Sequence, residues 1–268
     1  MMQMVEPLDD ASAAALGKAA FQGLVRFFLG VSQLRPDTWR VVSAGPLLVL
    51  HGHGPHGALT AALETEPGAS GRDAQAVRTG IAEGSLIFVT ALPEHESGVH
   101  DYLISQGFTR RVSPTMVAAA TTLPLAEQLP SWLRVKTVGS DGMHALLSRI
   151  QVESLGEDFA PRAAMKRLFG LSPGGPVVHL LGLVGDQPVA SATLMRFGEP
   201  ASIWGVATVP EMRGRGIGRA MTLEACRLAH RLGHQTVSLY ATPMGLPVYA
   251  RLGFRECGCL SLYTISRT

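Results

Sequence analysis

The sequence predicts a mixed α/β protein made of two similar lobes, each a twisted, mainly antiparallel mixed sheet flanked by helices. Apolar, strand-like runs alternate along the chain with amphipathic, helix-like segments. Gly185-Asp186, between two apolar runs, is typical of an antiparallel hairpin and makes the sheet mixed. A faint internal parallel suggests two copies, because Gln106-Gly107-Phe108-Thr109-Arg110 lies 146 positions before Leu252-Gly253-Phe254-Arg255-Glu256.

The first half contains the elements expected of one such lobe. In order, these are a helix over 11–29, strands over 39–42, 47–51 and 58–63, a helix over 74–83, a strand over 86–90, a helix over 99–106 and an extended segment over 108–119. The offset of 146 places the run 58–63 on 204–209, which are apolar too. The order of elements therefore favours a duplication.

The boundary between the lobes is expected in 123–132, where two prolines separate apolar segments, so the domains are 1–128 and 129–268. The second half is expected to hold strands over 133–138, 177–183, 188–197, 202–209, 237–240 and 255–263, and helices over 143–155, 162–169, 217–232 and 246–251. Asp141 is the expected N-cap of the first of these helices. Gly233 is expected to be the left-handed residue that ends the helix 217–232.

The most informative stretch joins the strand over 202–209 to the helix that begins at Ile217. Pro210 ends the strand, and three glycines within Arg213–Gly218 leave the backbone without Cβ atoms. A helix N-terminus offers unpaired N–H groups and the positive end of its dipole, so this turn predicts a phosphate site. The glycine spacing of dinucleotide-binding turns and the Gly-Lys-Ser/Thr of nucleotide loops are both absent.

The turn reads Arg-x-x-Gly-x-Gly, and Leu239-Tyr240-Ala241-Thr242-Pro243 and Val248-Tyr249-Ala250-Arg251-Leu252-Gly253-Phe254 follow it. With these motifs in this order, the chain resembles the GNAT superfamily of acyl-CoA-dependent N-acetyltransferases. The resemblance implies acetyl-CoA as acyl donor and Tyr249 as general acid. It assigns donor binding to Val206, Ala207, Thr208, Arg213, Gly214, Arg215, Gly216, Ile217, Gly218, Arg219 and Thr242. Thr242 stands where relatives often have asparagine.

The first half then resembles a degenerate copy of the same fold. Its loop Glu66-Pro67-Gly68-Ala69-Ser70-Gly71 is acidic and lacks the Arg-x-x-Gly-x-Gly spacing. Leu103 occupies the position that corresponds to Tyr249, and Tyr102 is one residue away, about 100° around a helix. This lobe is expected neither to hold coenzyme A nor to protonate a thiolate, and to help shape the acceptor side.

The general base is not identified by the sequence. The strands SIWGVATV and TVSLY carry no carboxylate, and Glu199, Glu211, His179 and His234 are interpreted as loop or turn residues. Proton transfer through water, or an acceptor amine of low pKa, would suit the absence of a carboxylate on these strands. The resemblance implies direct transfer in a ternary complex, and the acceptor stays open among a peptide N-terminus, lysine, a polyamine, an amino acid and an aminoglycoside. The alternative is a non-catalytic acyl-CoA-binding regulatory module.

Composition narrows the classes of partner. Residues 1–130 carry 8 basic against 12 acidic residues, and residues 131–268 carry 15 against 9, so the arginines of the second half suit an anionic ligand. Nucleic acid is disfavoured, because there is no basic run and aromatic residues make up only 6%. The histidines of 51–56 are interpreted as part of a turn rather than a metal site, and Cys257-Gly258-Cys259 has no second pair.

The cellular setting is expected to be cytoplasmic. Three cysteines, an odd count, favour reduced thiols. The N-terminal residues lack the basic region of a signal peptide, and the uncharged apolar stretch at 112–126 is short for a membrane span. The protein is expected to be a monomer or homodimer without a membrane partner.

Overall fold

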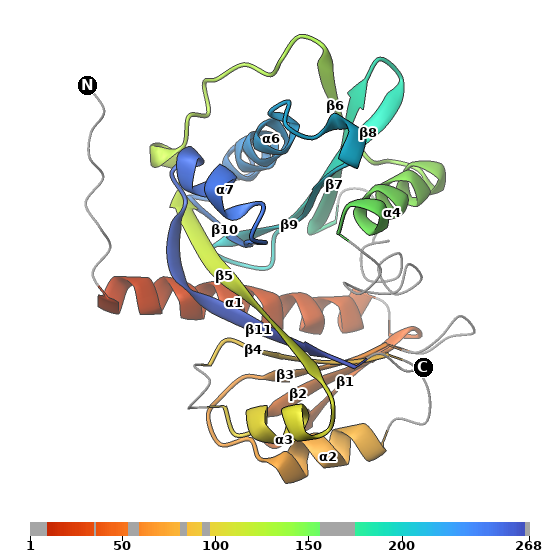
Figure 1. Ribbon diagram of the computed structural model, residues 1–268, viewed down its shortest axis with the longest axis vertical. Coiled ribbons are helices and arrows are strands. Elements are labelled where there is room, and N and C mark those ends of the chain that lie inside the picture. The colour runs from red at the N-terminus through yellow and green to blue at the C-terminus, as the bar shows by residue number, and fades with distance from the viewer. Residues whose placement is uncertain are drawn as a thin grey trace.

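One large mixed sheet organises the molecule. The computed structural model describes residues 10–34, 36–52, 59–80, 85–92, 97–155 and 175–265. Within them, eleven strands form a single sheet in the order β1-β2-β3-β4-β11-β5-β10-β9-β8-β7-β6 (Figure 1). Eight of the ten neighbouring pairs are antiparallel, and β3–β4 and β9–β10 are parallel. The predicted mixed α/β class is therefore confirmed.

The elements follow the predicted order. The first half comprises α1 (Asp10–Leu34), β1 (Trp39–Ala44), β2 (Leu47–Gly52), β3 (Leu59–Glu64), α2 (Gly71–Thr79), β4 (Ser85–Thr90), α3 (His100–Ser105), β5 (Thr109–Ala119) and the short 3₁₀ turn η2 (Ala120–Thr122). The second half comprises β6 (Leu133–Thr137), α4 (Asp141–Leu155), β7 (Val177–Val184), β8 (Gln187–Met195), β9 (Ala201–Thr208), η4 (Pro210–Met212), α6 (Ile217–Arg231), β10 (Thr236–Tyr240), α7 (Leu246–Leu252) and β11 (Arg255–Thr264).

One detail of the helix predictions differs. Asp141 is the first residue of α4 rather than its cap, so that prediction was wrong. The cap is Ser140, whose hydroxyl oxygen accepts a hydrogen bond from the Met143 N–H at 3.4 Å. The predicted left-handed residue after α6 is confirmed, since Gly233 has φ of 93°. The helix predicted over 162–169 lies outside the described residues.

The last strand of each half pairs with strands of the other half. β11 lies between β4 and β5, and β5 pairs on its far side with β10. The order β1-β2-β3-β4-β11 thus mirrors β7-β8-β9-β10-β5. Equivalent elements also keep a constant spacing, because α3 starts at His100 and α7 starts 146 positions later, at Leu246. The exchanged strands β5 and β11 run side by side between the two halves and make the sheet continuous (Figure 1).

Helices cover both faces of the sheet. Along β7, Leu180 packs into a cluster with α6, whereas its neighbour Leu181 packs with α4, so these helices lie on opposite faces. In the first half, Leu47 packs with α2 and α3, and Leu48 packs with α1. α1 shares its face with α4, and α6 and α7 share theirs with α2 and α3.

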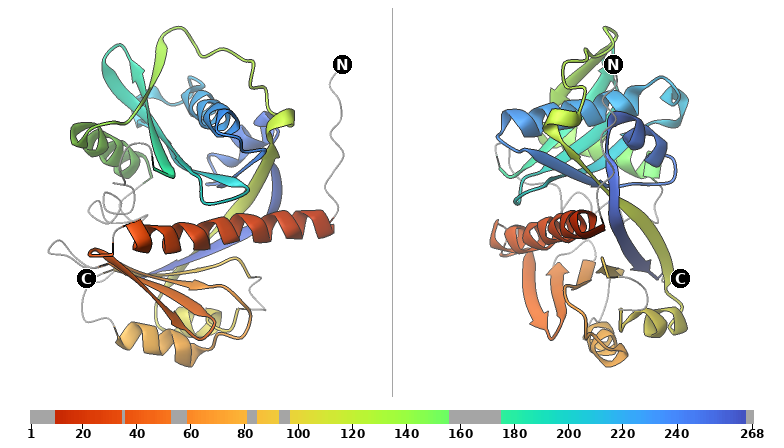
Figure 2. Two further views of the ribbon diagram at one scale, coloured as in Figure 1. Left: turned by 180° about the vertical axis from the view of Figure 1, so that it is seen from behind. Right: turned by 90° about the vertical axis from the view of Figure 1, so that its left-hand side faces the viewer.

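α1 lies between the two halves and contacts strands of both, as the rear view shows (Figure 2). Its larger buried side chains include Phe21, Leu24, Phe27, Phe28 and Val31. Each such side chain contributes about 1.5–3 kcal/mol on burial, so α1 is a main source of cohesion between the halves. By length and composition alone, its segment Ala11–Gln33, with mean hydropathy of 1.2, could also cross a membrane. Buried core helices share that profile.

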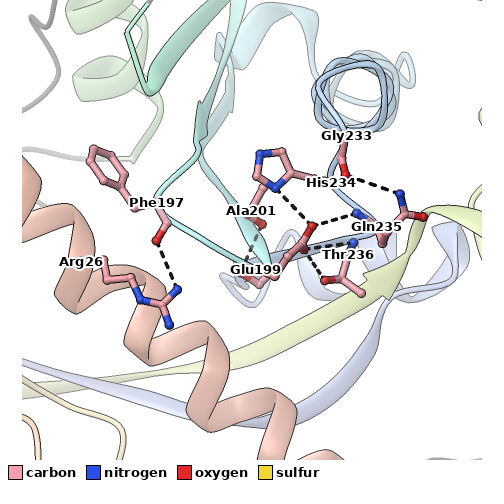
Figure 3. Close-up of polar contacts among 9 residues, drawn as sticks. Arg26, Phe197, Glu199, Ala201, Gly233, His234, Gln235 and Thr236 are labelled. Atoms are coloured by element: carbon pink, nitrogen blue, oxygen red, sulfur yellow. Dashed lines mark hydrogen bonds and ion pairs between the residues drawn. The ribbon is translucent and has the colours of Figure 1, made fainter.

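A carboxylate fixes the turn between β8 and β9 against the start of β10 (Figure 3). Glu199 accepts hydrogen bonds from the Gln235 N–H at 2.9 Å and the Thr236 hydroxyl at 2.6 Å. Its Oε1 also lies 3.3 Å from His234 Nδ1. Burial favours the neutral carboxyl, but the hydrogen bonds from Thr236 and Gln235, together with His234, hold the pKa of Glu199 below its ordinary value. Glu199 therefore has a structural role: it links the turn before β9 to the start of β10.

We expect Glu199→Gln to lower the free energy of unfolding by about 1 kcal/mol at pH 7. The effect is small because the Glu199 side chain is 48% exposed, and solvent weakens its interactions. A carboxylate whose pKa is lower in the folded than in the unfolded protein stabilises the fold at pH values above the pKa of the unfolded state. This contribution is lost as the pH falls through the pKa of the folded state. The difference between wild type and variant in urea unfolding should therefore stay constant from pH 7 to about pH 5 and shrink as the pH falls further. Glu211→Gln, at an exposed position, is the control, and a difference that does not change with pH would contradict this account.

Candidate functional site

The site forms where the parallel strands β9 and β10 separate. The two strands pair over Ala201–Ile203 and Val237–Leu239. Further along, β9 continues beside β8 through a register shift, with Gly205 in the left-handed region at φ of 57°. β10 instead continues beside β5. Among the described strands, the edge of Gly205–Thr208 that faces away from β8 has no neighbouring strand. The Thr208 carbonyl accepts a hydrogen bond from Arg213 Nε, and the other peptide groups that face this way have no ladder partner.

The loop between β9 and α6 turns on two glycines in the left-handed region. Gly214 has φ of 75° and Gly216 has φ of 77°, and a Cβ atom at either position would meet no protein atom within 4 Å. Gly216 is the N-cap of α6 and offers no side-chain cap. The N–H groups of the first turn of α6 therefore face an open corner without Cβ atoms, which is the arrangement that anion sites at helix N-termini use.

Tyr249 lies in the first turn of α7 and is 8% exposed. Burial raises the pKa of its phenol to about 12, so the hydroxyl keeps its proton at neutral pH. Gly245 makes room for the ring, since a Cβ at that position would lie 2.7 Å from the Tyr249 ring carbons. The Thr242 hydroxyl accepts a hydrogen bond from the Gly245 N–H at 3.1 Å and so supports the turn that leads into α7.

One cavity of about 460 Å³ brings these parts together. The residues predicted from the sequence that line it are Val206, Ala207, Thr208, Arg213, Gly214, Gly216, Ile217, Gly218, Arg219, Thr242 and Tyr249. Arg215 is not part of the lining. The sequence did not single out six further lining residues, Ser154, Met212, Met244, Gly245, Val248 and Arg251. Most of these adjoin the motifs, but nothing local in the sequence points to Ser154, which reaches the cavity from α4.

The three arginines of the loop and of the first turn of α6 differ in their contacts. Arg213 donates from Nε to the Thr208 carbonyl at 3.2 Å and from Nη2 to the Ser154 carbonyl at 3.1 Å, which ties the end of α4 to β9. Arg219 forms an ion pair with Glu127 of the segment between the halves. Arg215 is exposed. Arg213 and Arg215 add positive potential at the mouth of the cavity, where an anionic ligand would enter, while Glu127 offsets the charge of Arg219.

None of the carboxylates and histidines considered as bases lines the cavity. Glu199 and His234 bind each other at the turn between β8 and β9. The interpretation of His179 as a loop or turn residue was wrong, because His179 is buried on β7, where its Nδ1 lies 2.9 Å from the Thr193 hydroxyl oxygen. Glu211 is exposed on η4. Within the described lining there is consequently no Asp, Glu or His that could take a proton from a bound amine.

The corresponding place in the first half is closed. α2 starts at Gly71, 146 positions before Ile217, but its N-terminus carries a capping box in which Ser70 and Asp73 satisfy each other's N–H groups. Hydrogen bonds from Ser70 lower the pKa of Asp73 and keep it charged. The neighbouring backbone is also packed, because a Cβ on Gly98 would lie 1.7 Å from the Ala69 carbonyl oxygen. Gly68, 146 positions before Gly214, is also left-handed and open, but the N-terminus of α2 is capped by its own side chains.

Glu64 fills the end of the parallel pair β3–β4 in this half. It is 1% exposed and accepts a hydrogen bond from the Ser97 hydroxyl at 2.7 Å, while its Oε1 has no partner. Burial raises the pKa of Glu64, and this effect outweighs the hydrogen bonds from Ser97 and Thr90, which lower it. A group with a raised folded pKa stabilises the fold below its unfolded pKa, and this contribution is lost as the pH rises.

We therefore expect Glu64→Gln to become more stable relative to wild type as the pH rises from 5 to 8. The expected gain is about 1 kcal/mol, the scale of one buried polar atom without a partner. Urea unfolding at the two pH values measures it, and Glu66→Gln, at an exposed position in the following loop, is the matched control. If Glu64→Gln is more stable than wild type at pH 5 but not at pH 8, the expected pH dependence of the stability difference is wrong.

Metal binding finds no support among the described residues, where no group of three potential ligands occurs. His51 lies in β2 with its Nδ1 3.2 Å from the Thr60 hydroxyl oxygen, and His53 and His56 fall outside the described residues. Cys226, Cys257 and Cys259 are free thiols.

Residues 177–256 match the family model of the acetyltransferase (GNAT) domain. The second half of the chain is therefore similar to the acetyltransferase (GNAT) domain over these residues. The matched segment runs from β7 into β11 and contains every residue that lines the cavity except Ser154. A search of curated proteins gave no match.

Solved structures share the fold over almost the whole chain. A GCN5-related N-acetyltransferase from Kribbella flavida is 21% identical over 96% of both chains, with a TM-score of 0.67. A putative acetyltransferase of the GNAT family from Novosphingobium aromaticivorans is 14% identical over 92% of this chain and 99% of its own, with a TM-score of 0.57. A tandem GNAT protein from the clavulanic acid biosynthesis pathway is 13% identical over 97% of both chains, also with a TM-score of 0.57. At these identities the likeness establishes the fold alone.

Proposed function

We propose that the chain is an N-acetyltransferase that moves an acetyl group from acetyl-CoA to a primary amine by direct attack in a ternary complex. The observation that carries this proposal is the single cavity where the open edge of β9, the uncapped start of α6 and Tyr249 meet. The match of residues 177–256 to the GNAT domain supports acetyl transfer as the chemistry of this cavity.

The open corner at α6 fits the diphosphate of coenzyme A. Gly214 and Gly216 leave space next to the backbone, and the first-turn N–H groups would donate to phosphate oxygens. The unpaired edge of Val206–Thr208 would bind the pantetheine and acetyl amide and carbonyl groups. A backbone N–H directed at the acetyl oxygen stabilises developing negative charge, which in other enzymes is worth about 2.7–4 kcal/mol.

Tyr249 is proposed to be the general acid. The amine nitrogen forms a bond to the acetyl carbonyl carbon while the carbon–sulfur bond breaks. The departing sulfur takes the Tyr249 proton, and the amine loses its extra proton to water. Because burial raises the pKa of Tyr249 to about 12, the phenol is protonated before the reaction at any physiological pH.

The thiols of the chain do not favour a covalent acetyl-cysteine route. Burial raises the pKa of Cys226 to about 12 and that of Cys257 to about 11, so both stay protonated at neutral pH, and neither lines the cavity. Attack by the amine itself is the simpler course. Free thiols also agree with the cytoplasmic setting that we propose.

We further propose that residues 1–128 are a degenerate GNAT-like lobe and residues 129–268 the catalytic one. The capping box at Ser70 and the buried Glu64 support this view, because they occupy the place that corresponds to the open corner of the second half. The first lobe would then serve mainly to complete the sheet, through the exchange of β5 and β11.

Binding of acetyl-CoA can be tested by thermal melting of wild type and Gly216→Asp. At a hundred times its dissociation constant, the ligand should add about 2.7 kcal/mol, which raises Tm by about 5–10 °C. Gly216→Asp should remove this shift, because it places a carboxylate in the phosphate corner. Gly107→Asp is the control, since Gly107 has a similar φ of 80° and equally open surroundings. Absence of a shift in wild type at millimolar ligand would refute the proposal.

Tyr249→Phe separates catalysis from binding. We expect kcat to fall about 10²–10⁴-fold while the dissociation constant of acetyl-CoA is unchanged, since the ring stays and only the proton donor is lost. Thiol release measures the rate and calorimetry the affinity. An unchanged rate, or a wild type that binds acetyl-CoA without turnover over any amine, would favour the alternative of an acyl-CoA-binding regulatory module.

A further inference from the structure

The segment between the two halves, residues 123–132, passes over α6 and is anchored to it (Figure 1). Leu123 is buried in the cluster that contains α6, and Leu125 and Leu129 pack against the same cluster. Arg227 of α6 donates from Nε to the Leu125 carbonyl at 2.7 Å. These contacts fix the position of the residues between them, and Glu127 is one of these.

Glu127 brings a carboxylate to the first turn of α6. Its Oε1 accepts a hydrogen bond from Arg219 Nη1, and the two side chains form an ion pair. Arg219 also lines the cavity, together with Gly216 and Gly218 of the open corner. The hydrogen bond from Arg219 and the charges of Arg219 and Arg227 lower the pKa of Glu127 below its ordinary value, so the carboxylate is charged at neutral pH. The chain thus places a negative charge of its own beside the corner that we propose binds phosphate.

The ion pair is weak enough for a ligand to displace. The side chains of Arg219 and Glu127 are 34% and 45% exposed. An ion pair at such a position changes an equilibrium constant by up to about fivefold, because water competes for both charges. A phosphate on the same guanidinium makes charge-assisted hydrogen bonds, often two in parallel, and can also accept from the N–H groups at the start of α6. Arg219 can therefore exchange the carboxylate for a phosphate.

On the basis of the proposed binding of acetyl-CoA, we propose that Glu127 competes with the phosphates of the donor for Arg219. When the donor binds, a phosphate replaces the Glu127 carboxylate at Arg219, and the segment between the halves loses one of its contacts with α6. Glu127 thereby limits the affinity of the site for every ligand that carries these phosphates, acetyl-CoA and the product CoA alike. A lower affinity for CoA favours its release after acetyl transfer.

Calorimetry of acetyl-CoA binding to wild type and Glu127→Gln tests the proposal. We expect the dissociation constant of the variant to be about three- to fivefold lower at about 50 mM salt, because Arg219 is then free to bind a phosphate. The gain should be the same for CoA, which has the same phosphates. The ratio of the two dissociation constants should approach one at about 0.5 M salt, where exposed charges are screened.

Glu224→Gln is the matched control. Glu224 forms an ion pair with Arg227 on the same helix, and neither is among the described residues that line the cavity. This variant makes the same change of net charge, and we expect its dissociation constant for acetyl-CoA to equal that of wild type. Glu127→Ala should act in the same direction as Glu127→Gln, and Tm without ligand shows that each variant is folded.

Hydrogen–deuterium exchange at 125–129 gives a second readout. These amides should exchange faster in wild type when CoA is bound, and this change should be absent in Glu127→Gln, which lacks the ion pair with or without CoA. A dissociation constant that is unchanged or higher in Glu127→Gln, or exchange at 125–129 that does not become faster in wild type, overturns the inference. The proposed function then stands, since wild type still binds acetyl-CoA. Calorimetry without any binding to wild type refutes the proposed function and the inference with it.

Discussion

The divergence of two parallel strands is the constraint on which the site depends. β9 stays with β8 through the irregular step at Gly205, and β10 stays with β5, which the first half of the chain supplies. A complete ladder between β9 and β10 would satisfy every peptide group and leave no room for a ligand. Because the strands part after Ile203, the backbone of Val206–Thr208 keeps hydrogen-bonding capacity for a substrate.

The two halves have the same order of elements but differ at the N-terminus of the corresponding helix. Each half places a helix after the first strand of a parallel pair, and the N-terminus of that helix decides what the place can do. At α6 the cap is Gly216 in the left-handed region, without a side chain. At α2 the cap is Ser70, and Asp73 closes the box. A few side chains thus distinguish a helix N-terminus with open N–H groups from one whose N–H groups are capped by its own side chains.

Much of this could be predicted from the sequence, because the informative signals are local. The signals lie within about thirty residues: Pro210, the glycine spacing and the apolar period of α6. Each indicates the backbone conformation of its own segment, namely the end of the strand, the turn and the helix. The positions of β5 and β11 could not be predicted, since pairing between strands more than a hundred residues apart leaves no local signal. The α/β pattern is therefore compatible with separate sheets as well as with the one observed.

The side chains of the site were less predictable than its backbone. An arginine next to a glycine-rich turn suggests contact with phosphate, yet the Arg213 guanidinium bonds the Thr208 and Ser154 carbonyls. Ser154 reaches the site only because α4 packs against β9, a contact between distant parts of the chain. The direction of a long side chain depends on neighbours that only the folded structure brings together.

Hydrogen–deuterium exchange with and without acetyl-CoA tests the central claim most directly, since it reports on the backbone N–H groups themselves. The account predicts slower exchange on ligand addition at the amides of 206–208 and 214–220, and unchanged exchange at 68–75, where α2 begins. Protection at 68–75, or none at 214–220 under saturating ligand, would contradict it.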